Sequence, residues 1–412
     1  WFNWGDRQAV LFDLPARKFY LFGLTFWPQD LIYLAVLLIM AALSLFLFTA
    51  LAGRLWCGYA CPQTVWTETF LWMERITEGN RSKRMKLDRG PWTTEKVLRK
   101  SSKQVLWVSF AFFTGFTFVS YFTPMRDLWM KLTTLSLGPW ETFWIVFYSL
   151  ATYGNAGFLR EQVCKYMCPY ARFQSAMFDR DTLIIAYDEE RGEPRGGRRR
   201  GKARDETPLG DCIDCTMCVQ VCPTGIDIRK GLQYECIACA ACIDVCDTVM
   251  EKMDYPKGLI RYTTEHALHS EKQKIFRPRI AIYSALLLSL FAGWSISIAA
   301  RTPLAVDVIR DRNALYREVP GDRIENVYTL KIMNKDSADR RYTITAMGVD
   351  GIAVETNLNN AVIPSGAIES VAAQVSVPAG SASGRNEVTI VVTADDNPEI
   401  AVRETTVFHA PF

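Results

Sequence analysis

Two neighbouring stretches, CIDCTMCVQVCP at Cys212–Pro223 and CIACAACIDVC at Cys236–Cys246, determine the fold at the centre of this chain. Each has three cysteines separated by two residues, and a fourth cysteine after three further residues. Two such runs are the ligand pattern of a ferredoxin with two [4Fe–4S] clusters, because three thiolates bind one cluster and the fourth crosses to the other. The spacing therefore predicts a two-cluster, ferredoxin-like domain that transfers electrons.

The crossover determines which cysteines share a cluster. We assign Cys212, Cys215, Cys218 and Cys246 to one cluster. The other cluster takes Cys222, Cys236, Cys239 and Cys242. A zinc module is the alternative, but structural zinc sites use pairs of ligands rather than triplets. The repeats differ after their last cysteine, where Pro223 follows one and Asp247 follows the other. We expect the extra carboxylate to lower the potential of its cluster.

The composition indicates a chain of several domains. Its 412 residues exceed one ordinary domain, and 49% apolar and 12% aromatic residues are high fractions for a soluble protein. The net charge of +3 is small, and no nucleic-acid partner is expected. No cysteine follows Cys246, so the last third is a fold without disulfides. None of the three histidines lies in an apolar span, which excludes a bis-histidine b-type haem in a membrane bundle.

Four apolar stretches approach the ~20 residues that a membrane-spanning helix requires. They are Leu31–Gly53, Val105–Thr123, Trp140–Leu159 and Ile280–Ala300. Tryptophans such as Trp27 and Trp56 near their ends fit the aromatic belt of a bilayer interface. The third stretch is more polar, so we expect it to pack against its neighbours. These features predict an α-helical membrane bundle.

The basic residues predict how the spans are oriented. Ten lysines and arginines lie between Arg75 and Lys103, whereas the loop between the second and third spans has only Arg126 and Lys131. Because cytoplasmic loops are enriched in such residues, the first loop and the ferredoxin-like domain are expected in the cytoplasm. The part after Arg301 is then periplasmic, in a multi-pass protein of the bacterial inner membrane. Residues 1–30 would also lie outside, which requires a further span upstream and agrees with a chain that does not begin with Met.

The C-terminal region changes to an alternation of apolar and polar residues. The predicted strands are Asn326–Asn334, Arg341–Val349, Glu369–Val377, Glu387–Asp395 and Ala401–Phe408. Turn-forming residues, such as Pro364-Ser365-Gly366, separate them. Short strands at this spacing predict a β-sandwich of immunoglobulin type. It has no evident catalytic residues, so we expect a docking or structural role.

Two further segments have ordinary interpretations. The Gly- and Arg-rich segment Arg191–Asp205 is predicted to be a flexible linker, with binding to anionic lipid headgroups as the alternative. His266 and His269 would share one helical face. Exposed or hydrogen-bonded histidines are the expected interpretation, and a metal site is the weaker one.

A second repeat, CxxxCP, occurs as CGYACP from Cys57 to Pro62 and as CKYMCP from Cys164 to Pro169. Each copy follows an apolar span and precedes a predicted helix. Proline is favoured at the first position of a helix, which makes Cys61 and Cys168 candidate N-cap residues. The positive end of the helix dipole there would favour the thiolate.

Together, the four CxxxCP sulfurs would form a soft site suited to Cu(I) or to a dithiol/disulfide couple. The alternative is that Cys57, Cys61, Cys164 and Cys168 are small residues that pack between membrane helices. The repeated spacing and the shared proline favour the functional interpretation. Met167 could add a thioether ligand, although a packing role explains it equally well.

Spans, paired CxxxCP motifs, a two-cluster ferredoxin, a last span and a terminal sandwich together resemble the CcoG family, also called FixG or RdxA. The resemblance covers essentially the whole chain, including GDRQAVLFDLPARKFYLFGLTFWPQD near its start. It implies reduction of Cu(II) to Cu(I) for assembly of cbb3-type cytochrome c oxidase. Cys57, Cys61, Cys164 and Cys168 would then handle copper, and copper transporters, chaperones or oxidase assembly factors would be the partners.

The expected organisation is therefore multidomain. It comprises an extracytoplasmic segment at 1–30, membrane helices with both CxxxCP motifs at 31–180, the ferredoxin-like domain at 181–278, a last span at 279–301 and the sandwich at 302–412. The alternative function is a quinol-oxidising conduit like NapH and NosR, which share CxxxCP motifs and pass electrons to periplasmic reductases. A non-redox scaffold is the third possibility, and eight cluster-binding cysteines argue against it.

Overall fold

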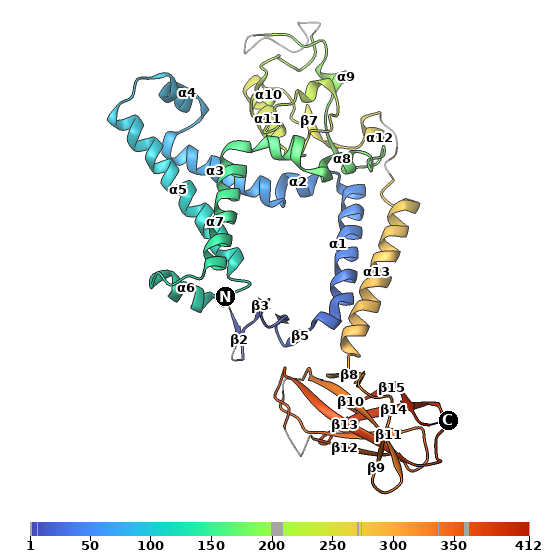
Figure 1. Ribbon diagram of the computed structural model, residues 1–412. Coiled ribbons are helices and arrows are strands. Elements are labelled where there is room, and N and C mark those ends of the chain that lie inside the picture. Colours follow the sequence, from blue (N-terminus) through green and yellow to red (C-terminus); the bar gives the residue numbers. More distant parts are fainter. Residues whose placement is uncertain are drawn as a thin grey trace. The chain divides into compact units, whose positions relative to one another are not determined.

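The computed structural model describes residues 2–5, 7–198, 209–269, 272, 274–336, 338–357 and 362–411. The chain divides into two compact units (Figure 1). The first contains Leu11–Arg17 and Pro28–Gly293, and the second contains Phe2–Val10, Lys18–Trp27 and Trp294–Phe412. Both cysteine repeats belong to the first unit.

The first unit is mainly helical up to the ferredoxin-like region. Its elements are α1 (Leu31–Ala52), α2 (Leu55–Tyr59), α3 (Pro62–Glu78), α4 (Arg81–Arg89), α5 (Thr94–Val119), α6 (Met125–Thr133), α7 (Pro139–Gly154), the π-helical segments η2 (Asn155–Leu159) and η3 (Val163–Met167), and α8 (Pro169–Ser175). The helix α1 ends at Gly53, which has a φ of 57°. A Cβ there would lie 2.2 Å from the carbonyl oxygen of Leu183. Only glycine therefore fits where the chain turns from α1 toward the first CxxxCP motif.

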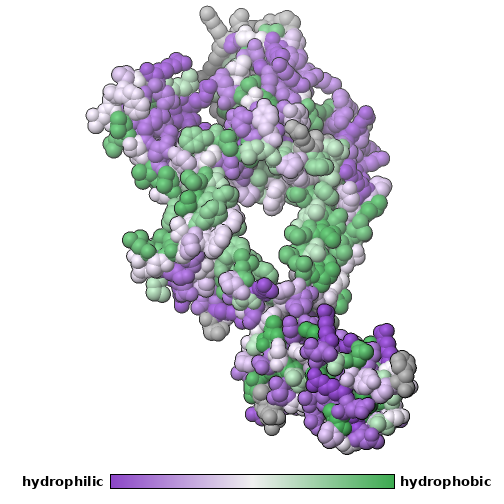
Figure 2. All heavy atoms as spheres, viewed as in Figure 1, coloured by the Kyte–Doolittle hydropathy of each residue, from purple (hydrophilic) through white to green (hydrophobic). Residues whose placement is uncertain are grey.

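Two helices, α1 and α13 (Pro278–Ala299), are long and apolar enough to cross a membrane by length and composition. Only 6% of the apolar window of each helix is buried, which leaves most of its side chains without protein contacts. Figure 2 shows hydrophobic residues gathered over these helices and over α5 and α7. The adjoining ends of α1 and α13 are linked by Arg277, which donates to the carbonyl oxygen of Ala50 at 2.9 Å.

The other two predicted spans are helical but do not meet the same criterion within the described part of the chain. The helix α7 has 16 residues and ends at Gly154, and the π-helical η2 occupies the rest of the predicted span. The helix α5 has 26 residues, and its first turns are basic. The two helices pack closely, since a Cβ on Gly115 would lie 2.5 Å from the hydroxyl of Ser149. Small residues at such contacts are typical of membrane helices, but four spans are not shown.

The ferredoxin-like region is built around two short helices and a two-stranded sheet. Its elements are β6 (Ile184–Tyr187), α9 (Glu189–Gly192), α10 (Met217–Gln220), η5 (Ile228–Lys230), α11 (Ala241–Met253), β7 (Ile260–Thr263) and α12 (Glu265–Leu268). The strands β6 and β7 pair antiparallel. Ile185 of β6, Ile260 of β7, and Met250 and Leu259 are almost fully buried. The sheet thus closes one side of the two cysteine-rich loops.

The Gly- and Arg-rich segment that starts at Arg191 is only partly a linker. Its later part, within residues 199–208, lies outside the described residues. The earlier part is held by the ferredoxin-like domain: Arg191 donates to the carboxylate of Asp211 at 2.6 Å, and Arg198 donates to the hydroxyl of Tyr255 at 3.1 Å. The flexible-linker prediction is wrong for this part, because Arg191 and Arg198 bond to the domain.

The second unit contains a β-sandwich of two antiparallel sheets, ordered β12–β13–β10–β8 with β9 on β10, and β11–β14–β15. Its strands are β8 (Leu304–Arg310), β9 (Arg317–Val319), β10 (Arg323–Asn334), β11 (Tyr342–Met347), β12 (Ala353–Thr356), β13 (Ile368–Pro378), β14 (Arg385–Ala394) and β15 (Ala401–His409). All five predicted strands are confirmed with small shifts of their ends. The strands β8, β9 and β12 were not predicted.

Alternate residues of the long strands fill the sandwich core, as the period of two requires. Tyr328, Leu330 and Ile332 of β10 are 0% exposed. The N-terminal strands, β1 (Asn3–Trp4), β2 (Arg7–Gln8), β3 (Val10–Asp13), β4 (Lys18–Leu21) and β5 (Leu24–Phe26), form short hairpins. Lys18 donates to the carbonyl oxygen of Gly366 at 2.6 Å, which attaches part of this segment to the sandwich.

Candidate functional site

The two cysteine-rich loops have the same backbone shape. Asp214 and Thr216 in the first loop, and Ala238 and Ala240 in the second, all have φ between 54° and 64°. Residues other than glycine rarely adopt this conformation. Its repetition at equivalent positions indicates that both loops wrap around the same kind of group. The helices α10 and α11 begin directly after these loops, so the third cysteine of each run lies in a first helical turn.

The structure brings the eight cysteines together in two sets of four. One cavity is lined by Cys212, Cys215, Cys218 and Cys246, and a second by Cys222, Cys236, Cys239 and Cys242, with Cys218 also in its wall. These are the sets that the crossover predicts from the sequence. Four thiols around one cavity are the donor set of a [4Fe–4S] cluster, so the residues fit two such clusters.

The chemistry of these thiols agrees with that fit. Burial, together with the other three thiols of each set, raises the pKa of Cys242 and of Cys246 to about 12. A pKa this high keeps the thiols protonated at neutral pH. Metal ligands are thiolates, so bound iron has to replace those protons. Iron loading is therefore expected to release protons.

The two CxxxCP motifs have equivalent local structures. Cys57 lies in α2 and Cys164 in η3, while Cys61 and Cys168 are the N-cap residues of α3 and α8. Both N-caps are extended, and a proline opens each helix. The predicted N-cap positions are confirmed, although neither thiol makes a side-chain capping bond.

The two motifs meet in space. The thiol of Cys57 donates to the amide oxygen of Gln174 at 3.3 Å, and this glutamine lies in α8, which follows the second motif. Burial raises the pKa of Cys57 to about 12; Arg54 opposes the shift, and the three other CxxxCP thiols add to it. Burial likewise raises the pKa of Cys164 to about 11. All four thiols are therefore electrostatic neighbours.

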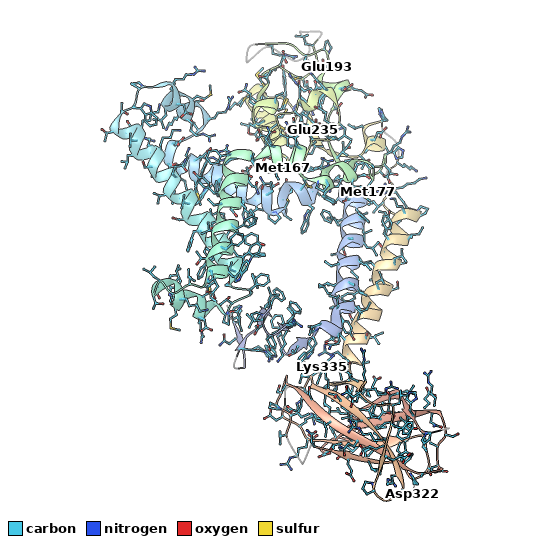
Figure 3. The ribbon with its side chains drawn as sticks, viewed as in Figure 1. Met167, Met177, Glu193, Glu235, Asp322 and Lys335 are labelled. Atoms are coloured by element: carbon cyan, nitrogen blue, oxygen red, sulfur yellow. The ribbon has the colours of Figure 1, made fainter. Side chains whose placement is uncertain are left out.

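The four thiols do not form a preformed site for one ion. Within the described residues, no three side chains among His, Cys, Asp and Glu are close enough to hold a single metal ion. All four CxxxCP cysteines are half-buried and free of disulfides. Met167, between Cys164 and Cys168, is 60% exposed and lies where α7 and its π-helical extension approach the ferredoxin-like region (Figure 3).

The first CxxxCP motif contacts a cluster-binding loop directly. A Cβ on Gly58 would lie 2.8 Å from the carbonyl oxygen of Ile237 and 2.9 Å from that of Ala238, which are the residues between Cys236 and Cys239. The backbones of the motif and of the loop are therefore as close as packing allows. This contact joins the CxxxCP thiols to one cluster site.

Arg54 fixes the same contact from the other side. It is 3% exposed and donates to the carbonyl oxygens of Tyr234, of Cys236 and of Ala171. One guanidinium thus connects the end of α1, the second cluster loop and the helix after the second CxxxCP motif. Its positive charge also lies near Cys57, where it stabilises a thiolate.

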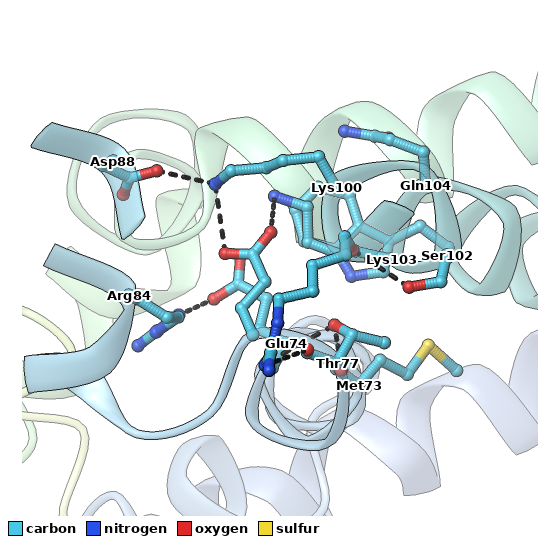
Figure 4. Close-up of polar contacts among 12 residues, drawn as sticks. Met73, Glu74, Thr77, Arg84, Asp88, Lys100, Ser102, Lys103 and Gln104 are labelled. Atoms are coloured by element: carbon cyan, nitrogen blue, oxygen red, sulfur yellow. Dashed lines mark hydrogen bonds and ion pairs between the residues drawn. The ribbon is translucent and has the colours of Figure 1, made fainter. Parts of the chain in front are cut away.

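A buried network of charges holds α3 in place (Figure 4). Glu74 and Glu78 are 4% and 3% exposed. Glu74 pairs with Arg84 of α4 and, at 2.6 Å, with Arg160; Glu78 pairs with Lys100 and Lys103 of α5. Since Cys61 is the N-cap of α3 and Arg160 lies four residues before Cys164, the network positions both motifs.

Sequence reasoning missed Arg54, Gln174 and the two buried glutamates. An arginine three residues before Cys57, directly after an apolar span, was a possible signal for the first. The ordinary interpretation of the histidines agrees with their surroundings: the Nδ1 of His266 is hydrogen-bonded to the carboxylate of Asp181 at 2.8 Å, and His269 is exposed.

Comparisons with known proteins agree with this architecture. Residues 159–265 match a family described as a 4Fe-4S dicluster domain, residues 34–80 match a 4Fe-4S binding domain, and residues 294–411 match the IG-like fold at the C-terminal of FixG. The chain is 39% identical to protein RdxA of Cereibacter sphaeroides, over 85% of this chain and 77% of RdxA. It is 41% identical to RdxB of the same organism, over 86% of this chain and 77% of RdxB. It is 38% identical to the nitrogen fixation protein FixG of Rhizobium meliloti, over 85% and 74%.

Proposed function

The chain belongs to the family of FixG, RdxA and RdxB, and on that premise we propose that this iron–sulfur electron-transfer protein is a membrane-bound reductase of Cu(II). The Cu(I) formed serves assembly of cbb3-type cytochrome c oxidase, as the resemblance to the CcoG family implies. Copper is the substrate, and the four CxxxCP cysteines are where it receives its electron.

The contact between Gly58 and the loop Cys236–Cys239 is the observation that supports this proposal most strongly. When bound, a [4Fe–4S] cluster supplies reversible one-electron transfer. The loop that would hold one cluster touches the motif that has Cys57 on one side of Gly58 and Cys61 on the other. Arg54 keeps these parts together by donating to both segments.

The chemistry of the thiols suits the product. Reduction of Cu(II) adds one electron and moves no atoms, so the site needs only an electron supply and ligands that favour Cu(I). Thiolates are soft ligands that select Cu(I), and a pair of them is sufficient. Copper is expected to be held by thiols of the two motifs and then released.

The proposed location is the bacterial inner membrane, with α1 and α13 as spans. Both have the required length and composition. The basic residues of α4 and of the start of α5 support a cytoplasmic position for the ends of these helices that adjoin the ferredoxin-like domain. The proposed partners are copper transporters, copper chaperones or oxidase assembly factors.

The experiment measures the rate of Cu(II) reduction by purified parent and variant proteins whose two clusters have been chemically reduced. A Cu(I) chelator reports the product. The double variant Cys61→Ser, Cys168→Ser keeps two good N-cap residues and removes two soft ligands. We expect unchanged iron content and a loss of most Cu(II) reduction. The variant Met167→Leu is the matched control and should retain the parental rate. A double variant that reduces Cu(II) at the parental rate would refute the thiol site.

A further inference from the structure

A cavity of about 740 Å³ lies between the CxxxCP region and the ferredoxin-like domain, inside the first unit. One face of α3, from Thr64 to Arg75, forms one wall, and one face of α11, from Ala241 to Thr248, forms the opposite wall. The twelve residues from Thr64 to Arg75 extend over about 16 Å of helix. The cavity is thus an elongated groove between two helices, and its volume is within the range of ligand sites.

One part of the groove reaches both redox centres. Cys222, a predicted cluster ligand, and Cys164, a CxxxCP thiol, both belong to its lining. Leu71, Ile237 and Val245 provide apolar surface between the helices. Glu68, Glu161 and Asp244 also line the groove, and Glu68 and Asp244 are exposed. A planar ring placed against the apolar surface would lie beside a cluster site, with its edge open to solvent.

The part beyond the end of α3 is positively charged. Arg75 at the end of α3 and Arg81 at the start of α4 line it. Arg84 and Arg160 also line the groove, and both pair with the single carboxylate of Glu74. Within the described residues, neither Arg75 nor Arg81 forms an ion pair, and Arg81 donates only to the amide oxygen of Gln220, at 3.1 Å. Two arginines without carboxylate partners suit a phosphate.

The need to deliver electrons one at a time limits which class of electron donor the groove can bind. A one-electron centre cannot accept hydride, so a nicotinamide cannot supply it directly. A quinol supplies single electrons but has an uncharged lipid tail, which does not suit the arginines. A reduced flavin nucleotide combines a planar ring that releases two electrons singly with an anionic phosphate at the end of a flexible chain.

We infer that this groove binds a reduced flavin nucleotide, with its ring between Leu71 and Val245 and its phosphate at Arg75 and Arg81. The flavin is the electron donor: it loses two electrons and two protons, the electrons enter at the wall formed by Cys222, and the protons pass to solvent. This inference rests on the proposed electron relay and adds the chemical class of its donor.

The test uses the full chain with its clusters intact and flavin mononucleotide as the probe. Binding is measured by quenching of flavin fluorescence, and electron entry by the bleaching of cluster absorbance after mixing with reduced flavin. In the double variant Arg75→Gln, Arg81→Gln, we expect about 100-fold weaker binding, on the order of tenfold for each lost charge-assisted contact. Riboflavin lacks the phosphate, so its binding should not change.

The matched control is Lys86→Gln, Arg89→Gln, which removes the same charge from exposed positions of α4 outside the groove. It should bind the flavin nucleotide like the parent. A second variant, Thr248→Trp, fills the groove from an exposed position and should weaken both flavins. The inference is overturned by an equal loss of flavin affinity in the control, or by an unchanged affinity in the Arg75 and Arg81 variant. It is also overturned if a soluble quinol reduces the clusters and flavin does not. Cu(II) reduction by chemically reduced protein should stay at the parental level in all these variants, so failure here is distinguishable from failure of the proposed function.

Discussion

The ferredoxin-like domain and the CxxxCP region each gather cysteines in sets of four, but by different means. In the ferredoxin-like domain each set surrounds a cavity, and the loops repeat the same left-handed backbone at equivalent positions. In the CxxxCP region the cysteines come from two helix starts and the segments before them, and Cys61, Cys164 and Cys168 lie close enough to raise the pKa of Cys57. The first arrangement fits a resident cofactor, and the second fits an ion that enters and leaves.

The largest expected effect separates the two regions by iron content. The variant Cys218→Ser should lose one cluster and destabilise the other, because Cys218 is in the wall of both cavities. The parent should contain about eight irons per chain, as two [4Fe–4S] clusters require. Iron and sulfide analysis measures this, with Cys168→Ser as the control that should keep the parental content. Four irons per parental chain, or stoichiometric zinc, would contradict the account.

The next effect tests the contact that joins the regions. Gly58→Val introduces a Cβ at 2.8 Å from the carbonyl oxygen of Ile237, so the motif and the cluster loop must move apart. We expect unchanged iron and a Cu(II) reduction rate lowered by about tenfold or more, at a packing cost of about 1–3 kcal/mol. Rapid mixing of reduced protein with Cu(II) provides the rate. Gly154→Ala is the control, because no atom lies within 4 Å of its Cβ position. Equal rates for the Gly58 variant and the parent would show that the contact is unimportant.

A smaller effect is expected at Arg54. The variant Arg54→Gln loses the charged bonds to Cys236 and Ala171 while the carbonyl groups stay buried. The free energy of unfolding of the first unit should fall by about 2–4 kcal/mol, measured by denaturant unfolding of the cluster absorbance. Arg180→Gln is the control, since its ion pair with Glu265 is exposed and should contribute less than about 1 kcal/mol. If both variants unfold alike, Arg54 does not hold the two regions together.

The smallest effect lies in the sandwich. Tyr328 is fully buried, and its hydroxyl donates to the carbonyl oxygen of Val407 at 2.8 Å. Tyr328→Phe should lower the free energy of unfolding of the sandwich by about 1 kcal/mol, with Tyr316→Phe as an exposed control. Iron content and Cu(II) reduction should not change, because neither uses the sandwich. A loss of iron or of Cu(II) reduction would show that the sandwich contributes to the redox unit.

The sequence was most informative where spacing alone determines chemistry. The cysteine triplets and the alternation in β10, β13 and β14 predicted the cluster sets and the sandwich, because ligand geometry and a period of two leave few alternatives. The N-cap positions of Cys61 and Cys168 followed from their prolines. The contact of Gly58 with Ile237 could not be predicted, since it depends on the tertiary approach of segments far apart in the chain.

The length and polarity of a segment gave a wrong prediction where an α-helix continues as a π-helix. The segment Trp140–Leu159 was expected to be one helix, but the chain changes to π-helix after Gly154 and places Arg160 against Glu74. Hydropathy does not register such a change, because it depends on backbone hydrogen bonding and on one buried ion pair. The same holds for Arg198, which looked like part of a solvated linker and is held by Tyr255.

The most direct test of the central claim is a single-turnover experiment on fully reduced protein mixed with Cu(II). Cluster re-oxidation and Cu(I) formation are followed together in the parent and in the Cys61→Ser, Cys168→Ser variant. We expect the two signals to share one rate in the parent, with one Cu(I) formed for each electron lost. Both should be slowed strongly in the variant at equal iron content. Parental rates in the variant would mean that copper meets the electrons elsewhere, and the CxxxCP thiols would then be structural.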